Sequence, residues 1–283
     1  MTWSTIIDIP PAEWQIRPFE RMLFVGSCFA ENMGRRFCDD MFRAVVNPYG
    51  VMYNPASILH SVQRYLNCPF SISHFPFPAV AVLTLGTNHI YRLRETGEIV
   101  DNCEKRPANL FSEESLSIDQ CADYLRRTAD LLLQANPDMH ILLTVSPIRY
   151  RKYGYHGSQL SKSTLLLAAD KIAEEYPAVT YFPAYEIVLD ELRDYRFYAA
   201  DMLHPSEQAA DYIYSRLADT FFAPETHAFL RQWRPLKQAL NHRPINPDSP
   251  EYQRFRQQTL EQIRQLHLPD DCPLDSRLWT FDS

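Results

Sequence analysis

Residues with reactive or hydrogen-bonding side chains directly follow several short apolar runs of this sequence. A Gly-Ser-Cys string occupies residues 26–28, a Gly-Thr-Asn string occupies residues 86–88, and Asp201 precedes His204 by three positions. If the apolar runs are parallel strands, these residues lie beyond the carboxyl ends of the strands, where open α/β sheets bind their ligands. The sequence therefore predicts that a nucleophile, polar donors and an acid–base pair meet at one edge of a sheet.

The spacing of Asp201 and His204 suits proton transfer. A carboxylate three residues upstream can fix the tautomer and orientation of the imidazole, and His204 could then accept and return a proton during nucleophilic attack. The competing interpretation makes Asp201 a turn or helix-capping residue and His204 a surface histidine.

The elements that must position these residues alternate along the chain. Apolar runs of strand length are separated by amphipathic stretches of helix length, which is typical of an α/β domain with a parallel sheet covered on both faces. The predicted strands span residues 22–25, 44–46, 79–85, 141–145 and 179–182. The predicted helices span residues 29–42, 119–134 and 161–176, and a further helix opens at residues 204–207.

Two further features lie outside this alternation. Residues 90–94 and 99–100 flank a Glu-Thr-Gly-Glu turn, which predicts a β-hairpin inserted beside the sheet. Beyond residue 223 the sequence is richer in Arg, Gln and Pro and predicts two helices, residues 225–240 and 251–266, joined by a proline-bearing linker. We therefore expect an α/β domain over residues 1–223 and a helical C-terminal extension over residues 224–283.

Composition and charge argue against several classes of protein. Only 7 of the 283 residues are glycine, and no G-x-G-x-x-G or G-x-x-x-x-G-K-[ST] string is present, which argues against dinucleotide and P-loop binding. A net charge of −7 argues against a non-specific nucleic-acid binder. The first 14 residues lack a secretory signal pattern, and no apolar run approaches the roughly 18 residues of a membrane span, so we expect a cytoplasmic protein.

The six cysteines follow no metal-binding spacing, so we expect free thiols, no metal site and no cofactor. They are Cys28, Cys38, Cys68, Cys103, Cys121 and Cys272.

The order of these strings resembles the SGNH (GDSL-like) hydrolase superfamily. More narrowly it resembles the GSCFA family, which is named for the letters found here at residues 26–30. This resemblance runs from about Phe24 to Phe221 and includes Asn47-Pro48-Tyr49-Gly50, Asn102-Cys103, Ser146-Pro147-Ile148-Arg149, Ser161-Lys162 and Asp194-Tyr195-Arg196-Phe197-Tyr198. It implies a three-layer, flavodoxin-like fold and ester or acyl chemistry, and it names no substrate.

The identity of the nucleophile depends on register. A gap-free overlay of residues 25–29 on the superfamily's apolar-Gly-Asp-Ser-Leu string places Cys28, not Ser27, at the nucleophile, and the start of the following helix would lower the pKa of that thiol. A slip of one residue makes Ser27 the nucleophile, with His204 as its general base. The string can also be structural, with Ser27 capping the helix and Cys28 packing as a small apolar residue.

Other residues after the predicted strands would complete the site. We expect the backbone amides of the nucleophile and of Gly50, with the side-chain amide of Asn88, to hold an oxyanion. Asn88 can equally be an ordinary turn residue. Asn47 is expected to contact the substrate, and Arg149 either holds a carboxylate or phosphate of the substrate or caps the loop that follows its strand.

We therefore predict an acyl-handling enzyme, an esterase or acyltransferase, that acts on a small-molecule ester through an acyl-enzyme. An acylated carbohydrate is suggested only by analogy with the superfamily. The alternative is a catalytically inactive binding protein that recognises a glycan or acyl group in the same cleft. The two differ in whether an activated ester leaves an acyl group on the protein.

Overall fold

The computed structural model describes residues 4–68, 77–103, 106–266 and 268–269. Its centre is a five-stranded parallel sheet in the order β2-β1-β3-β7-β8. The strands are β1 (Arg21–Gly26), β2 (Arg43–Val46), β3 (Val80–Leu85), β7 (His140–Val145) and β8 (Val179–Tyr181). All five predicted strands are confirmed, and the order is the one expected of a flavodoxin-like fold.

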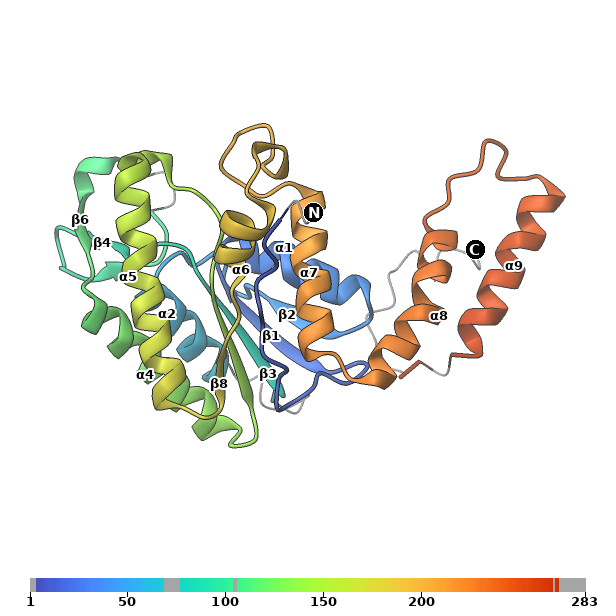
Figure 1. The fold of residues 1–283 in the computed structure, drawn as a ribbon, viewed down its shortest axis with the longest axis horizontal. Helices are drawn as coiled ribbons and strands as arrows, with labels where there is room; N and C mark the ends of the chain where they lie inside the picture. Colours follow the sequence, from blue (N-terminus) through green and yellow to red (C-terminus); the bar gives the residue numbers. More distant parts are fainter. Residues whose placement is uncertain (1–3, 69–76, 104–105, 267, 270–283) are drawn as a thin grey trace.

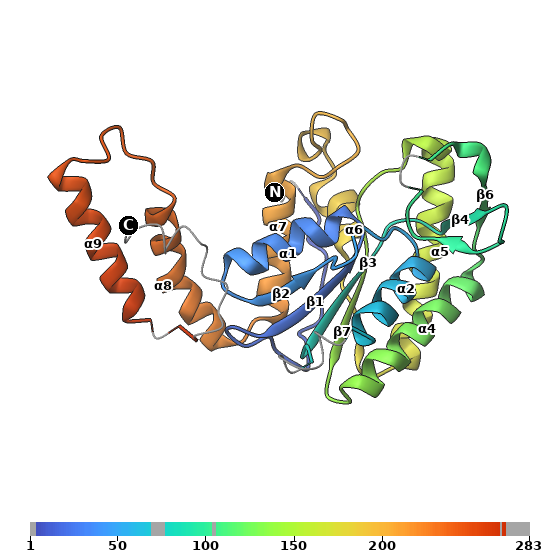
Figure 2. The ribbon, with the colours of Figure 1, turned by 180° about the vertical axis from the view of Figure 1, so that it is seen from behind.

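Helices cover both faces of the sheet, which gives three layers (Figures 1 and 2). One face carries α1 (Cys28–Asp39) and α7 (Glu207–Phe221), and the other carries α2 (Pro55–Leu66), α4 (Ile118–Ala135) and α5 (Gly154–Glu175). Short helical turns lie at α6 (Ala184–Glu186), Ile187–Leu192, Ala108–Leu110, Arg151–Tyr153 and Tyr195–Phe197.

Side chains of each central strand alternate between the two layers, as the pleat of a strand requires. In β1, Met22 and Phe24 pack into the core beneath α1 and α7, whereas Leu23 and Val25 pack into the core beneath α2, α4 and α5. All four side chains are buried. The continuous apolar run is therefore explained by burial on both faces, and this burial fixes the register of the strand.

A small antiparallel sheet stands beside the main one, in the order β5-β4-β6. The predicted hairpin is confirmed as β4 (His89–Leu93) and β5 (Ile99–Val100). The third strand, β6 (Phe111–Ser115), was not predicted. Its sequence FSEES has one apolar residue, so it becomes a strand only through its pairing with β4.

Helix α2 also escaped prediction, although its signals are present in the sequence. Asn54 caps it by accepting a hydrogen bond from the Ser57 amide, and Pro55 occupies a first-turn position. Helix α5 begins at Gly154, earlier than the predicted residue 161. None of the described helices is long and apolar enough to cross a bilayer.

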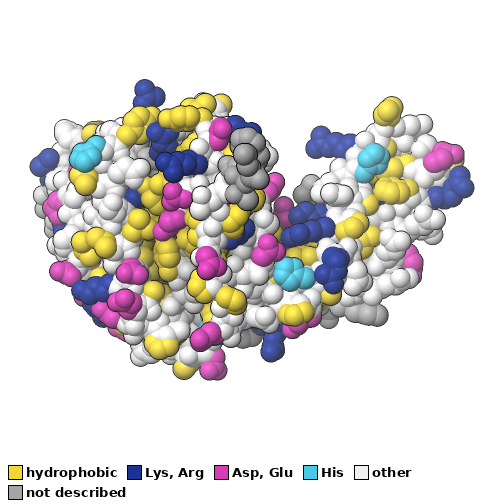
Figure 3. Space-filling model, viewed as in Figure 1, with side chains coloured by type: hydrophobic (Ala, Val, Ile, Leu, Met, Phe, Trp, Pro, Cys, Tyr) yellow, Lys and Arg dark blue, Asp and Glu magenta, His cyan; other side chains and the backbone are white. Residues whose placement is uncertain are grey.

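The two C-terminal helices, α8 (Pro224–Leu240) and α9 (Pro250–Arg264), form a lobe beside the main body (Figure 3). Lys and Arg side chains gather on the side of this lobe that faces the sheet layers. Arg234 and Lys237 of α8 hold the buried carboxylate of Asp40, at 2.7 and 3.2 Å, and Trp233 Nε1 donates to the Asp39 carbonyl. Charge pairing and one buried aromatic ring therefore fix α8 to the end of α1.

Candidate functional site

Ser27 and Cys28 lie at the turn between β1 and α1, at the carboxyl edge of the sheet. Gly26 has a φ of +149°, and a Cβ there would stand 2.3 Å from the Thr84 carbonyl oxygen, so a glycine is required where β1 passes β3. Ser27 is fully buried and is the N-cap of α1. Its hydroxyl accepts from the Phe29 amide at 3.3 Å and shares a 3.1 Å hydrogen bond with the Thr84 hydroxyl.

Cys28 is the first residue of α1 and is half-buried. Burial raises the pKa of its thiol, and this outweighs the lowering effect of the backbone amides of Cys28 and Phe29. The start of the helix lowers the pKa of this thiol as expected, but desolvation of the thiolate is the larger effect, so the net shift is upward. The five described cysteines are free, and Cys272 lies outside the described residues.

Asp201 and His204 form a hydrogen-bonded pair on an exposed loop. Asp201 Oδ2 lies 2.5 Å from His204 Nδ1, while Asp201 Oδ1 accepts from the backbone amides of Leu203 and His204 at 2.8 and 3.0 Å. These amide donors lower the pKa of Asp201 to about 2. An ionised Asp201 favours the tautomer with its proton on Nδ1, which leaves His204 Nε2 as the basic atom.

The loop that carries His204 is tied to the carboxyl end of β7. The backbone amide of Arg149 donates to the Leu203 carbonyl, and its guanidinium donates to the Met202 carbonyl, each at 3.0 Å. Arg149 thus holds this loop, and its guanidinium lies 4.2 Å from the centre of the Tyr155 ring. Among the described residues, no hydrogen bond joins His204 to Cys28, so proton transfer between them requires a bridging molecule or a movement of the loop.

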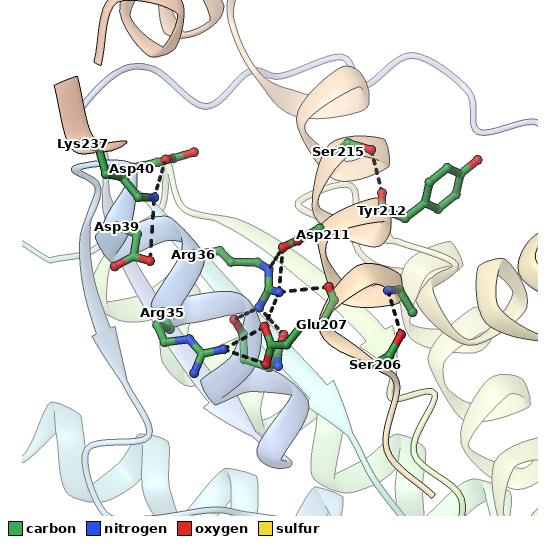
Figure 4. Close-up of polar contacts among 12 residues, drawn as sticks. Arg35, Arg36, Asp39, Asp40, Ser206, Glu207, Asp211, Tyr212, Ser215 and Lys237 are labelled. Atoms are coloured by element: carbon green, nitrogen blue, oxygen red, sulfur yellow. Dashed lines mark hydrogen bonds and ion pairs between the residues drawn. The ribbon is translucent and has the colours of Figure 1, made fainter. Parts of the chain in front are cut away.

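A buried arginine fixes the two helices that begin beside Cys28 and His204. Figure 4 shows Arg36 reaching from α1 to Glu207 and Asp211 in the first turns of α7. Its guanidinium donates to Asp211 at 2.8 Å and to Glu207 at 2.7 Å, and it also bonds the Asn32 side chain at 2.6 Å. Because α1 starts at Cys28 and α7 starts three residues after His204, this contact sets how the two ends approach one another.

We expect Arg36→Met to lower the free energy of unfolding by about 2 kcal/mol, because several hydrogen bonds to charged groups are lost at once. Urea denaturation measures the change. Arg35→Met is the matched control, since Arg35 is 59% exposed and its one ion-pair partner among the described residues is Glu207, and we expect it to cost less than about 1 kcal/mol. Equal losses for the two variants would contradict the role given to Arg36.

The residues expected to hold an oxyanion are engaged within the protein. The Gly50 amide donates to the Asn47 carbonyl at 2.8 Å, and the Asn88 side-chain amide donates to the Leu116 carbonyl at 2.7 Å. Asn88 retains a second amide hydrogen, whereas the single hydrogen of Gly50 is used. The Asn47 Oδ1 atom accepts from Gly26, and its Nδ2 atom is buried without a hydrogen-bond partner.

The structure adds Lys162 and Tyr150 to this edge of the sheet. Lys162 is buried in α5, and its ammonium donates to the carbonyls of Gly86 and Ser146, both at 2.6 Å. The Tyr150 hydroxyl is buried and has no hydrogen-bond partner in the part of the chain that the structure describes. From the sequence, Lys162 was named only as part of the family resemblance and was given no role in the site, although one signal was available: it occupies the same stripe of α5 as the buried residues Leu165, Ala169 and Ile172.

Comparison with solved structures finds esterases at low sequence identity. A family 3 carbohydrate esterase from Clostridium thermocellum shares 14% identity, with a TM-score of 0.42, over 75% of this chain and 97% of that chain. A catalytic mutant of Axe2, an acetylxylan esterase from Geobacillus stearothermophilus, shares 13% identity, with a TM-score of 0.42, over 73% of this chain and 95% of that chain. No curated protein matches the chain.

Family models give a direct assignment. The model of the GSCFA family matches residues 21–75 and 74–217, and a second model, the C-terminal domain of GSCFA domain proteins, matches residues 233–269. The first match alone spans the sheet, both helical layers and the loop of His204. The chain belongs to the GSCFA family.

Proposed function

We propose that this protein is an acyl-handling enzyme, an esterase or acyltransferase, with Cys28 as its nucleophile and a small-molecule ester as its substrate. One observation carries the proposal: Cys28 is partly exposed at the start of α1, while the neighbouring Ser27 hydroxyl is fully buried as the helix cap. Asp201 and His204, on the loop fixed to β7, would supply the acid–base pair at the same edge.

The chemistry proceeds in two steps. His204 accepts the proton of the Cys28 thiol, and the thiolate attacks the carbonyl carbon to form a C–S bond. The bond to the leaving alcohol then breaks as that alcohol takes the same proton from His204. Water or an acceptor alcohol then attacks the thioester, His204 removes its proton, and the C–S bond breaks to free Cys28. Asp201 stabilises the positive imidazolium that forms during each step and holds its orientation.

Oxyanion stabilisation falls mainly to the start of α1. No described residue accepts a hydrogen bond from the Cys28 amide, because this amide lies in the first turn of the helix and has no partner one turn earlier. The second hydrogen of the Asn88 side-chain amide is a further donor. Arg149, with three tyrosine rings around its guanidinium, and Asn47 are the proposed substrate contacts, and an acylated carbohydrate is the substrate class we favour.

Intact-mass measurement after incubation with p-nitrophenyl esters of increasing acyl length tests the proposal. We expect one added acyl group per chain, with release of one equivalent of nitrophenol before steady turnover. The raised pKa of Cys28 and the missing contact to His204 favour the second candidate, a binding protein without turnover. Absence of an adduct at every chain length and at pH values up to 9 would support that candidate instead.

A further inference from the structure

Lys162 is a cation buried inside the sheet layers. Its side chain is 1% exposed, and its ammonium donates to two backbone carbonyls, of Gly86 after β3 and of Ser146 after β7. No carboxylate of the described residues forms an ion pair with it. A buried ammonium without a counter-charge is costly, and this burial lowers the pKa of Lys162 to about 7. A neutral side chain could donate to the same two carbonyls at a much smaller desolvation cost, so hydrogen bonding to them does not by itself explain a lysine here.

The thiol of Cys28 is the acidic group whose charge acts on Lys162. Gly86, whose carbonyl accepts from Lys162, packs against the Ser27-Cys28 turn: a Cβ on Gly86 would stand 3.4 Å from Ser27 Cβ. Lys162 is therefore hydrogen-bonded to a residue that packs against the residue next to Cys28. The charge of Lys162 lowers the pKa of Cys28, and the charge of Cys28 raises that of Lys162, whereas Glu31 on the solvent side acts on Cys28 in the opposite direction.

The surroundings of the Lys162 ammonium are shielded from solvent, because Lys162 is 1% exposed. The Tyr150 ring lies 5.2 Å from the Lys162 ammonium, and its hydroxyl would stand 2.4 Å from a Cβ on Gly86. A charge acts more strongly through such a medium than through water, because little solvent screens it. The charge of Lys162 therefore lowers the pKa of Cys28, although no hydrogen bond among the described residues joins the two side chains.

We propose that Lys162 is the buried counter-charge of the Cys28 thiolate, a positioning residue that makes Cys28 the reactive thiol of this chain. The inference rests on the proposed function only in taking Cys28 as the nucleophile. It concerns the thiol itself, so it can be measured without any ester.

The test is the rate of iodoacetamide alkylation of each thiol between pH 6 and 9, resolved by peptide mass. Lys162→Gln keeps a hydrogen-bond donor for the two carbonyls and removes the charge. We expect it to slow alkylation of Cys28 about tenfold at pH 7, as a rise of one pKa unit would. Cys38, near the other end of α1 and also half-buried with a raised pKa, is the internal reference and keeps its rate. An unchanged ratio of the two rates in a folded variant would overturn the proposal.

If circular dichroism shows that Lys162→Gln does not fold, the pH dependence of alkylation in the unmodified protein tests the proposal instead. Well below its pKa, an isolated thiol reacts about tenfold faster for each unit of pH, because the thiolate fraction grows at that rate. As Lys162 loses its proton around pH 7, Cys28 should depart from this slope while Cys38 follows it. The same tenfold slope for both thiols would refute the coupling. The two proposals can fail separately. If Lys162 controls the alkylation of Cys28 but no ester leaves an acyl adduct, the proposed function is wrong and the electrostatic coupling still holds.

Discussion

Cys28→Ala abolishes the acyl adduct and lowers acyl transfer on the order of 10⁴-fold or more, if Cys28 is the nucleophile. Removing the sulfur leaves the α1 cap and the Thr84 hydrogen bonds in place, because these belong to Ser27. The loss is therefore chemical rather than structural. Intact mass gives the adduct, and the rate of nitrophenol release gives the residual activity.

Ser27→Ala is the matched control on the adjacent residue. It removes the hydroxyl that accepts from the Phe29 amide and contacts Thr84, so we expect a loss of about 1 kcal/mol in the free energy of unfolding. The folded fraction should still form the adduct at close to the normal rate. The reverse pattern, with an adduct on Cys28→Ala and none on Ser27→Ala, would make Ser27 the nucleophile and would require the α1 cap to open.

His204→Ala lowers kcat/KM by about 10²–10⁴-fold, the usual loss when a general acid–base is removed. Asp201→Asn should give a comparable loss, because its oxygen can still accept from the backbone amides of Leu203 and His204 while its NH2 group faces His204 Nδ1 and favours the tautomer that leaves no basic Nε2. The pKa of Asp201 is lowered to about 2, so this carboxyl is negatively charged throughout the pH range in which the protein is assayed. A loss of activity between pH 4 and 7 therefore cannot come from protonation of Asp201.

His60→Ala is the control for this prediction. His60 Nδ1 lies 2.9 Å from a carboxylate oxygen of Asp101, so it forms the same kind of pair, but on α2 where the small sheet contacts that helix. We expect its removal to leave kcat/KM within about threefold of the unmodified enzyme. Equal losses for His60→Ala and His204→Ala, or no loss for His204→Ala, would remove His204 from the mechanism.

Local sequence was sufficient for much of the fold. Strands such as β1 and β3 are buried on both faces, so their continuous apolar runs are unambiguous. The Asp201–His204 pair was predictable for a related reason: three residues of chain bring the two side chains together, with the backbone amides of the same loop completing the turn. Strand β6 was not predictable, because its polar residues become a strand only by pairing with β4.

The sequence by itself determined which residue types stand at the carboxyl edge of the sheet and that His204 has a carboxylate partner. Only the tertiary structure decided what each side chain can do there. Thr84 in β3 and Gly86 in the loop after it pack against Ser27, which is buried as the cap of α1, while Cys28 remains partly exposed to solvent. Packing of α5 against β3 and β7 likewise brings Lys162 beneath the site. Spacing and periodicity indicate which residues are buried, but the partners that surround a buried group come from chain segments far apart in sequence, and they set its hydrogen bonds and its electrostatic field.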